Sequence, residues 1–269
     1  MPHDVEAVVI SNHRLSSEYN VLALAAPAIA QETEPGQFVM VKPSGSADPL
    51  LRRPFSVFEV LRDDDHVTGL SLLSKRVGAT TARLFEAEPG ERICCLGPLG
   101  KPFTPVDPPS TAWLVAGGVG LAPFAMLAEA LRRRGTVTRL YYGGRRAADL
   151  FYLDWFERAG VELVLATEDG SRGAHGRVTA PLEADLRRNG RSAVMYACGP
   201  EPMLAAVARL AADFGRPSQV SVERIMACGL GGCYSCVIPV REGSRSHFVR
   251  SCLEGPVFDG AAIDWDASH

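Results

Sequence analysis

The feature that most constrains this chain is a group of four cysteines in its last fifty residues. Residues 227–237 read Ala-Cys-Gly-Leu-Gly-Gly-Cys-Tyr-Ser-Cys-Val, and a fourth cysteine follows after fifteen more residues. Cys228, Cys233, Cys236 and Cys252 thus have the spacing Cys-x4-Cys-x2-Cys-x15-Cys. Three thiolates from one loop and a fourth from a later segment form the plant-type arrangement that holds a [2Fe-2S] cluster. The sequence therefore predicts one such cluster.

The residues between these cysteines support the same prediction. Gly229, Gly231 and Gly232 suit a tight loop around an inorganic core, because glycine reaches positive φ at little cost. A structural zinc site and two disulfides are the alternatives, but zinc sites usually combine two short cysteine or histidine pairs. Here the second half holds one cysteine, and His247 lies only five residues before Cys252. We favour the cluster and expect the other three cysteines, Cys94, Cys95 and Cys198, to be free.

Length and composition place the chain among ordinary globular proteins. It has 269 residues, of which 46% are apolar and 22% charged, enough for two or three modest domains. The formal net charge of −3 argues against a nucleic-acid partner. The first residues lack a basic signal region, and the uncharged run 111–128 contains three glycines and a proline, which indicates strand, turn and helix rather than a membrane span. We expect a cytoplasmic location, where thiolates remain available for metal.

Residues 5–96 have the pattern of an antiparallel β-barrel or sandwich. Short segments rich in Val, Ile, Leu and Phe alternate with turns such as Glu34-Pro35-Gly36 and Glu88-Pro89-Gly90. One helix is expected at 80–87, with Thr80 and Thr81 as candidate caps.

Two tetrapeptides in this region suggest an anion site. They are Arg53-Pro54-Phe55-Ser56 and Gly78-Ala79-Thr80-Thr81. An arginine and hydroxyl groups beside a helix N-terminus favour phosphate, because free N–H groups and the helix dipole both attract it. Taken alone, each tetrapeptide is a weak signal, and a strand turn and a helix cap are then the preferred interpretations.

From Ala112 the pattern changes to apolar strands that alternate with amphipathic helices. Strands are expected at 113–116, 138–142, 162–167 and 193–198, and helices near 123–134, 150–158, 179–189 and 202–214. This alternation predicts an α/β domain with a parallel sheet.

Two turns of this domain are candidate ligand sites. The first crossover contains Gly117, Gly118, Gly120 and Pro123, and a glycine-rich turn of this kind brings backbone N–H groups against a diphosphate. The last strand ends in Cys198-Gly199-Pro200, at the sheet edge where ligands bind in open α/β folds. Cys198 is the candidate catalytic residue. A tight turn and a buried strand cysteine are the alternatives.

These patterns together predict a multi-domain α+β protein. Residues 1–98 form an antiparallel β-barrel, 99–216 an α/β parallel-sheet nucleotide-binding domain, and 217–269 a small cluster module, with a link at Gly215-Arg216-Pro217.

The ordered set of motifs resembles the ferredoxin–NADP reductase superfamily with a C-terminal [2Fe-2S] module. Within it, Ser221-Val222-Glu223-Arg224-Ile225-Met226-Ala227-Cys228, the Cys-Gly-x-Gly-x-Cys core and Cys252-Leu253-Glu254-Gly255-Pro256-Val257-Phe258 are similar to the electron-transfer subunits of class B dihydroorotate dehydrogenases. The resemblance extends over essentially the whole chain.

The resemblance implies three cofactors and their binding residues. FAD is expected at Arg53, Pro54, Phe55 and Ser56, at Leu73, Ser74 and Lys75, and at Thr80 and Thr81. The family prefers an aromatic residue and an arginine where this chain has Ser74-Lys75. NAD is expected at Gly117, Gly118, Gly120, Pro123, Gly199 and Pro200, with further contacts from 143–145, 149–152 and 167–171. Arg145-Arg146 leave NADP open as the alternative.

The resemblance also implies a partner. Electrons enter from an FMN-containing catalytic subunit, pass through the cluster and FAD, and leave as hydride to NAD+, with two copies of each subunit in the assembly. Leu230, Tyr234 and Phe258 are interface candidates. The alternatives are the flavin and iron-sulfur subunit of a sulfhydrogenase, a glutamate-synthase-like or ferredoxin-type NAD(P)H oxidoreductase, and a non-catalytic zinc-stabilised interaction module.

Overall fold

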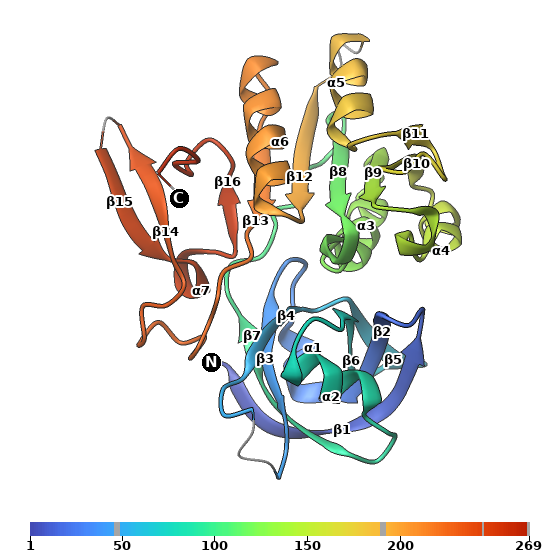
Figure 1. Ribbon diagram of the computed structural model, residues 1–269, viewed down its shortest axis with the longest axis vertical. Helices are drawn as coiled ribbons and strands as arrows, with labels where there is room; N and C mark the ends of the chain where they lie inside the picture. Colours follow the sequence, from blue (N-terminus) through green and yellow to red (C-terminus); the bar gives the residue numbers. More distant parts are fainter. Residues whose placement is uncertain (46–48, 189–191, 244, 268–269) are drawn as a thin grey trace.

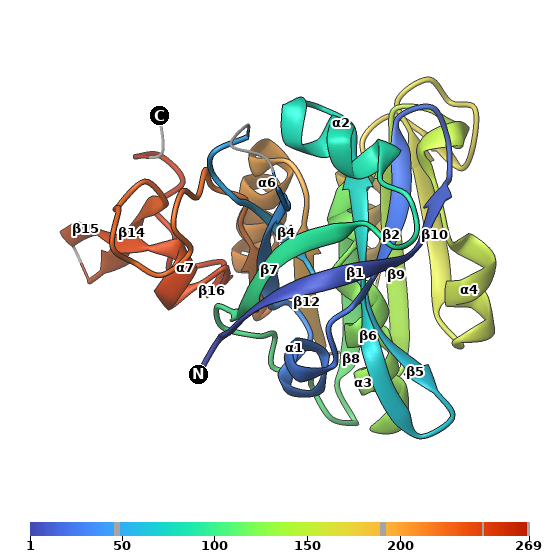
Figure 2. The ribbon, with the colours of Figure 1, turned by 90° about the horizontal axis from the view of Figure 1, so that it is seen from below.

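The structure is a computed structural model that describes residues 1–45, 49–188, 192–243 and 245–267. It contains an N-terminal antiparallel sheet with two helices, a central sheet with helices on both faces, and a small C-terminal part (Figures 1 and 2). This arrangement confirms the predicted fold class. None of the helices in the described ranges has the length and apolar character that a membrane crossing requires.

The N-terminal sheet is a curved, seven-stranded half-barrel with the strand order β4-β3-β7-β1-β2-β6-β5. Buried residues such as Ala7 and Val9 alternate with exposed ones along β1, so one face of the sheet is buried and the other faces solvent. Its elements are β1 (His3–Arg14), β2 (Tyr19–Ala25), α1 (Pro27–Glu32), β3 (Phe38–Pro43), β4 (Arg53–Ser56), β5 (Glu59–Asp63), β6 (His66–Lys75), α2 (Ala79–Glu86) and β7 (Arg92–Leu99).

The central sheet has the order β11-β10-β9-β8-β12-β13-β16, and all its pairs are parallel except the last. Its elements before the C-terminal part are β8 (Thr111–Gly117), η1 (Gly118–Leu121), α3 (Phe124–Arg133), β9 (Thr138–Gly144), η2 (Ala147–Asp149), α4 (Leu153–Arg158), β10 (Glu162–Thr167), β11 (Ala174–His175), α5 (Thr179–Arg188), β12 (Ala193–Cys198) and α6 (Glu201–Asp213). The four predicted strands and four predicted helices are confirmed. The predicted helix end at Asn189 lies outside the described residues.

Alternation along the central strands divides the core between two faces. Leu114 of β8 packs with α3 and α4, whereas its neighbours Trp113 and Val115 pack with α5 and α6. The first core also takes in Val21, Phe58 and Leu73 of the half-barrel, so the two larger parts share one apolar interior. Two ring contacts cross the same junction, Tyr19 with Phe151 at 4.9 Å, and Phe58 with Tyr152 at 4.7 Å.

The C-terminal part does not form a separate sheet domain. It comprises β13 (Ser218–Ser221), β14 (Val237–Glu242), β15 (Arg245–Arg250), α7 (Ser251–Glu254) and β16 (Val257–Asp259). β14 and β15 form a hairpin of their own, but β13 and β16 extend the central sheet. The segment 217–269, predicted as a small cluster module after the link at 215–217, thus also contributes two strands to the central sheet.

Two turns meet at the carboxyl edge of the central sheet with no room for a side chain between them. A Cβ on Gly120 would lie 2.2 Å from the carbonyl oxygen of Cys198, and one on Gly199 would lie 3.0 Å from the backbone nitrogen of Gly117. The glycines at 117 and 120 are therefore required by the contact between the two turns, which fixes the turn after β8 against the turn after β12.

We expect Gly120→Ala to destabilise the protein by about 1–3 kcal/mol, because the obstructing atom is backbone and cannot rotate away. Chemical denaturation measures this change. Gly232→Ala is the matched control, since its Cβ would meet nothing within 4 Å and Gly232 has no positive φ. Equal stability of the two variants would contradict the close contact.

Candidate functional site

The four predicted cysteine ligands lie together where the C-terminal part meets the half-barrel. Cys228, Cys233 and Cys236 belong to the loop between β13 and β14, and Cys252 lies on α7. Cys236 and Cys252 are buried in a small core that also contains Phe38, Met40, Leu96, Leu99 and Met226. Cys228 is half-buried and Cys233 is exposed. One half of the set therefore faces the barrel and the other half faces outward.

The cysteines contact one another as two pairs. The thiol of Cys233 lies next to Cys228, and that of Cys252 next to Cys236, close enough for that neighbour to affect the pKa of Cys233 and of Cys252. All seven cysteines are free, and within the described ranges no three His, Cys, Asp or Glu side chains are placed to hold one ion. A cluster with two irons needs two thiolates on each iron, whereas a structural zinc needs four ligands around one ion. The two-plus-two arrangement fits a [2Fe-2S] cluster better than zinc or disulfides.

The two pairs have opposite electrostatic surroundings. The Ser235 hydroxyl is 3.2 Å from the Sγ atom of Cys233, and this hydrogen bond, with others from the Ser235 and Cys228 backbone, lowers the pKa of the Cys233 thiol to about 6. Burial raises the pKa of Cys252 to about 12. Hydrogen bonds that favour a thiolate also favour a thiolate bound to metal. Sequence reasoning missed Ser235, whose position between two cysteines was the available signal.

The loop is held in shape by Arg250, another residue that sequence reasoning missed. Its Nη1 atom donates to the carbonyl oxygen of Gly231 at 2.9 Å, and its guanidinium lies 4.8 Å from the centre of the Tyr234 ring. Gly231 has a φ of +80°, and a Cβ there would lie 2.4 Å from a side-chain atom of Leu253. The positive φ predicted for these loop glycines is present at Gly229 and Gly231.

Arg53 is the clearest anion-binding candidate of the half-barrel. It begins β4, is exposed, and its Nη1 atom donates to the carbonyl oxygens of Leu51 and Arg52. Its neighbour Arg52 is instead paired with Asp4 at 2.7 Å. Because no carboxylate is paired with Arg53 among the described residues, its charge is available to a ligand. Pro54, Phe55 and Ser56 follow it along β4, half-buried.

The predicted residues of β6 have three different environments. Leu73 is buried in the core shared with the central domain. Ser74 is buried too, and its hydroxyl has no hydrogen-bond partner. Lys75 extends over the ring of Tyr19, 5.0 Å from its centre. A buried hydroxyl without a partner is rare in native proteins and indicates an absent ligand or water, so Ser74 fits a polar group bound at this end of β6.

The helix predicted at 80–87 is α2, but its N-cap is Gly78. The Thr81 hydroxyl oxygen accepts from the backbone N–H groups of Val77 and Gly78 at 2.8 and 2.9 Å. Thr80 is buried, so it does not cap the helix. The prediction that both threonines act as caps is therefore wrong for Thr80, whereas the Thr81 side chain does satisfy the backbone N–H of the N-cap residue, from the third helical position.

The glycine-rich turn after β8, the predicted nucleotide site, has one open position. Gly118 has a φ of +55°, and a Cβ there would meet only the Tyr19 hydroxyl, at 3.9 Å. A ligand can thus approach the backbone closely at Gly118, while Gly117 and Gly120 face the opposite turn. Pro123 precedes α3 at its N-cap position.

Cys198 lies at the end of β12 and is buried in the core between the half-barrel and the central sheet. Burial, with the nearby Glu223 carboxylate, raises the pKa of its thiol well above the usual range. Cys198 therefore remains a neutral thiol at physiological pH. Gly199 and Pro200 form the turn that leads from it into α6.

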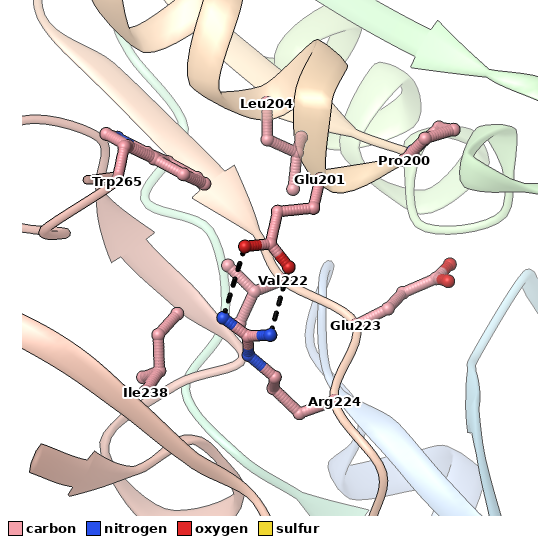
Figure 3. A pocket seen from close by; sticks show the side chains of 9 residues that line it. Pro200, Glu201, Leu204, Val222, Glu223, Arg224, Ile238 and Trp265 are labelled. Carbon is pink, nitrogen blue, oxygen red and sulfur yellow. Dashed lines mark hydrogen bonds and ion pairs between the residues drawn. The ribbon is translucent and has the colours of Figure 1, made fainter. Parts of the chain in front are cut away.

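A cavity of about 140 Å³ lies beside this turn, between the central domain and the C-terminal part (Figure 3). Arg224 forms a two-contact ion pair with Glu201 there, Nη1 to Oε2 at 2.9 Å and Nη2 to Oε1 at 3.4 Å. Figure 3 shows the Glu223 side chain pointing away from this pair. Sequence reasoning missed both partners, because 23 residues separate them.

Two family comparisons match parts of the chain. Residues 223–264 match the iron-sulfur cluster binding domain of dihydroorotate dehydrogenase B, and residues 114–209 match the oxidoreductase NAD-binding domain. The matched segments contain the four paired cysteines and most of the central sheet.

Curated relatives match almost the whole chain. The dihydroorotate dehydrogenase B (NAD(+)) electron transfer subunit of Geobacillus kaustophilus is 40% identical over 96% of this chain and 98% of its own length. The homologue of that subunit from Aquifex aeolicus is 36% identical over 94% and 96%.

Solved structures share the fold. The NADH-dependent reduced ferredoxin-NADP oxidoreductase has a TM-score of 0.85 and 28% identity, over 98% of this chain and 91% of that chain. A ferredoxin NADP+ reductase from Neisseria gonorrhoeae with bound FAD and NADP has a TM-score of 0.65 and 18% identity, over 79% and 92%.

We expect Cys252→Ala to lose iron and visible absorption, because one iron would keep a single thiolate of its pair. Iron analysis and an absorption spectrum measure the loss. Cys94→Ala is the control, since Cys94 contacts Ser44 and lies outside the four. An unchanged iron content in Cys252→Ala would overturn the ligand assignment.

Proposed function

The chain belongs to the family of dihydroorotate dehydrogenase B electron transfer subunits, and from that premise we propose that it passes electrons from a catalytic partner, through a [2Fe-2S] cluster and FAD, to NAD+. The observation that carries the proposal is the set of two cysteine pairs, one of them packed on the half-barrel strands β3 and β7. The cofactors supply the chemistry, since a flavin exchanges electrons singly with a cluster and in pairs with a nicotinamide.

The residues of this chain bind and orient these groups. In the proposal residues 1–98 bind FAD, 99–216 bind NAD+, and 217–269 hold the cluster. Cys236 and Cys252 would hold a bound cluster from the half-barrel side, and Cys228 and Cys233 would hold it from the outer side. Strand β3 connects the two redox sites, because Met40 packs beside the buried cysteines and pairs with Pro54 of β4.

The FAD site is proposed to consist of Arg53, Pro54, Phe55, Ser56, Leu73, Ser74, Lys75, Thr80 and Thr81. Arg53 binds the diphosphate, since its guanidinium is exposed and has no carboxylate partner among the described residues. Ser74 donates a hydrogen bond to the flavin from its otherwise unpaired hydroxyl. The apolar core around Leu73 excludes water from the flavin side of the junction.

The NAD+ site is proposed to consist of Gly117, Gly118, Gly120, Pro123, Gly199 and Pro200, with Cys198 at its nicotinamide end. Cys198 offers a neutral, polarizable sulfur there because its thiol stays protonated. Arg146 lies near Asp149 and Glu18, at 3.5 and 3.8 Å. These two carboxylates compete with a 2′-phosphate for its charge, which supports NAD+ over NADP+.

We propose an FMN-containing dihydroorotate dehydrogenase as the partner, in an assembly with two copies of each chain. Exposed apolar side chains of the C-terminal part, which we group as the docking patch, support a docking role. They are Ile225, Leu230, Tyr234, Phe248 and Leu253. Phe258, an interface candidate from the sequence, is instead half-buried: it pairs with Val220 from the edge strand β16 and packs against the core of the central sheet.

We expect Arg53→Ala to weaken FAD binding by about 10- to 100-fold, the value of a charge-assisted hydrogen bond to phosphate. The flavin content of the purified chain and a fluorescence titration with FAD measure this loss. Arg52→Ala is a matched control, because Arg52 is engaged by Asp4. Full retention of FAD by Arg53→Ala would contradict the site.

The deciding experiment for the function is co-expression of this chain with an FMN-containing dihydroorotate dehydrogenase. We expect dihydroorotate-dependent reduction of NAD+ with both chains together and none with either chain alone. Dihydroorotate-dependent reduction of NAD+ by this chain alone would contradict the proposal.

A surface variant tests the docking patch in the same assay. We expect Leu230→Lys to weaken the complex by about tenfold or more, because a lysine in an apolar interface loses its hydration. Native mass measurement detects this loss. Val137→Lys is the control, since Val137 is also exposed but precedes β9, at the amino ends of the parallel strands, whereas the cluster loop follows the carboxyl end of β13.

A further inference from the structure

Residues 222–226 connect the central sheet with the cluster loop, and they are anchored at both ends. The backbone nitrogen of Val222 donates to the carbonyl oxygen of Pro256 at 2.9 Å, and its side chain packs in the core of the central domain. Met226 packs with Phe38 and Cys236 on the half-barrel side. Arg224 lies midway between these anchors, four residues before Cys228. Its position therefore influences where the cluster loop begins.

Arg224 is held by Glu201 through both of its terminal nitrogens (Figure 3). The two side chains are only 22% and 34% exposed. The third nitrogen of the guanidinium, Nε, is buried without a hydrogen-bond partner. Among the described residues Glu201 is thus the acceptor that fixes the orientation of Arg224. The adjoining cavity leaves the pair space to shift.

Glu201 is coupled in turn to the nucleotide turn. It is the first residue of α6 and directly follows Pro200. The 198–200 turn is in contact with the turn after β8, as the close approach of Gly199 to Gly117 shows. A ligand that displaces either turn must move the start of α6, and with it the carboxylate of Glu201.

We propose that Arg224 is a positioning residue that transmits occupancy of the dinucleotide site to the cluster loop through its ion pair with Glu201. This inference rests on the proposed function, because it takes the turns at 117–120 and 198–200 as the dinucleotide site. Its physical content is a coupling free energy between two sites, which is reciprocal. If NAD+ binding favours one arrangement of the cluster loop, that arrangement raises the affinity for NAD+ by the same factor.

A second ion pair of the cluster module provides a matched comparison. Lys101 contacts Glu254 at 2.9 Å, and the two side chains are 58% and 50% exposed. This pair joins α7 to the segment after β7 and touches neither turn of the dinucleotide site. It shares the chemistry of the Arg224 pair but lacks its connection to the start of α6.

Hydrogen exchange of the oxidised, cofactor-loaded chain, with and without NAD+, tests the proposal. We expect NAD+ to slow exchange of the amides at 117–120 by direct binding, and of those at 222–227 by about fivefold or more through the coupling. Arg224→Gln and Glu201→Gln should keep the first effect and lose the second. Arg224→Lys, which keeps the charge, should restore part of it, and Lys101→Gln should behave as the unaltered chain.

Each outcome decides the question. Protection at 222–227 that persists in both Gln variants overturns the role of the pair, as does its absence from the unaltered chain when 117–120 are protected. Either result leaves the proposed function intact. Failure of NAD+ to protect 117–120 in the unaltered chain overturns the proposed dinucleotide site and the inference with it. A variant that does not fold is replaced in the comparison by its partner variant, since each removes the same ion pair.

Discussion

The packing of Cys236 and Cys252 against strands β3 and β7 is the contact on which the rest of the arrangement depends. Burying two thiols beside Met40 and Leu99 fixes the cluster loop on the half-barrel, while β13 and β16 fix the same segment to the central sheet. The C-terminal part is therefore tied to both larger parts. Electron transfer needs a fixed separation between redox centres, and a module attached at a single point would not supply it.

The glycine turns have a comparable role at the other end of the site. Sequence patterns attribute glycines after the first strand to the approach of a diphosphate. Here Gly117 and Gly120 are needed for contact with the 198–200 turn, and Gly118 is the position left open to a ligand. The proposed dinucleotide site thus consists of two touching turns, so its geometry depends on backbone packing as much as on any side chain.

The arginine side chains divide in the same way, into those held in an ion pair and those available to a ligand. Arg52 and Arg53 are adjacent, yet one is engaged by Asp4 and the other contacts only backbone carbonyl oxygens. Arg224 is fixed by Glu201 in a half-buried pair. Identical side chains therefore take different roles according to whether a carboxylate lies within reach, which sequence alone does not reveal.

The sequence by itself determined the fold class, the central strands and helices, and the four clustered cysteines, because hydrophobic periodicity and local spacing express these directly. It did not reveal the two-plus-two pairing of the thiols, the glycine turns that touch, or the ion pair of Arg224 with Glu201. It also left open whether Phe258 lies at an interface or packs locally, and in the structure Phe258 is half-buried against the central core. Each of these features depends on contacts between segments distant in the chain. Only the tertiary structure decides which side chains and turns meet there, because no local pattern encodes a partner twenty or two hundred residues away.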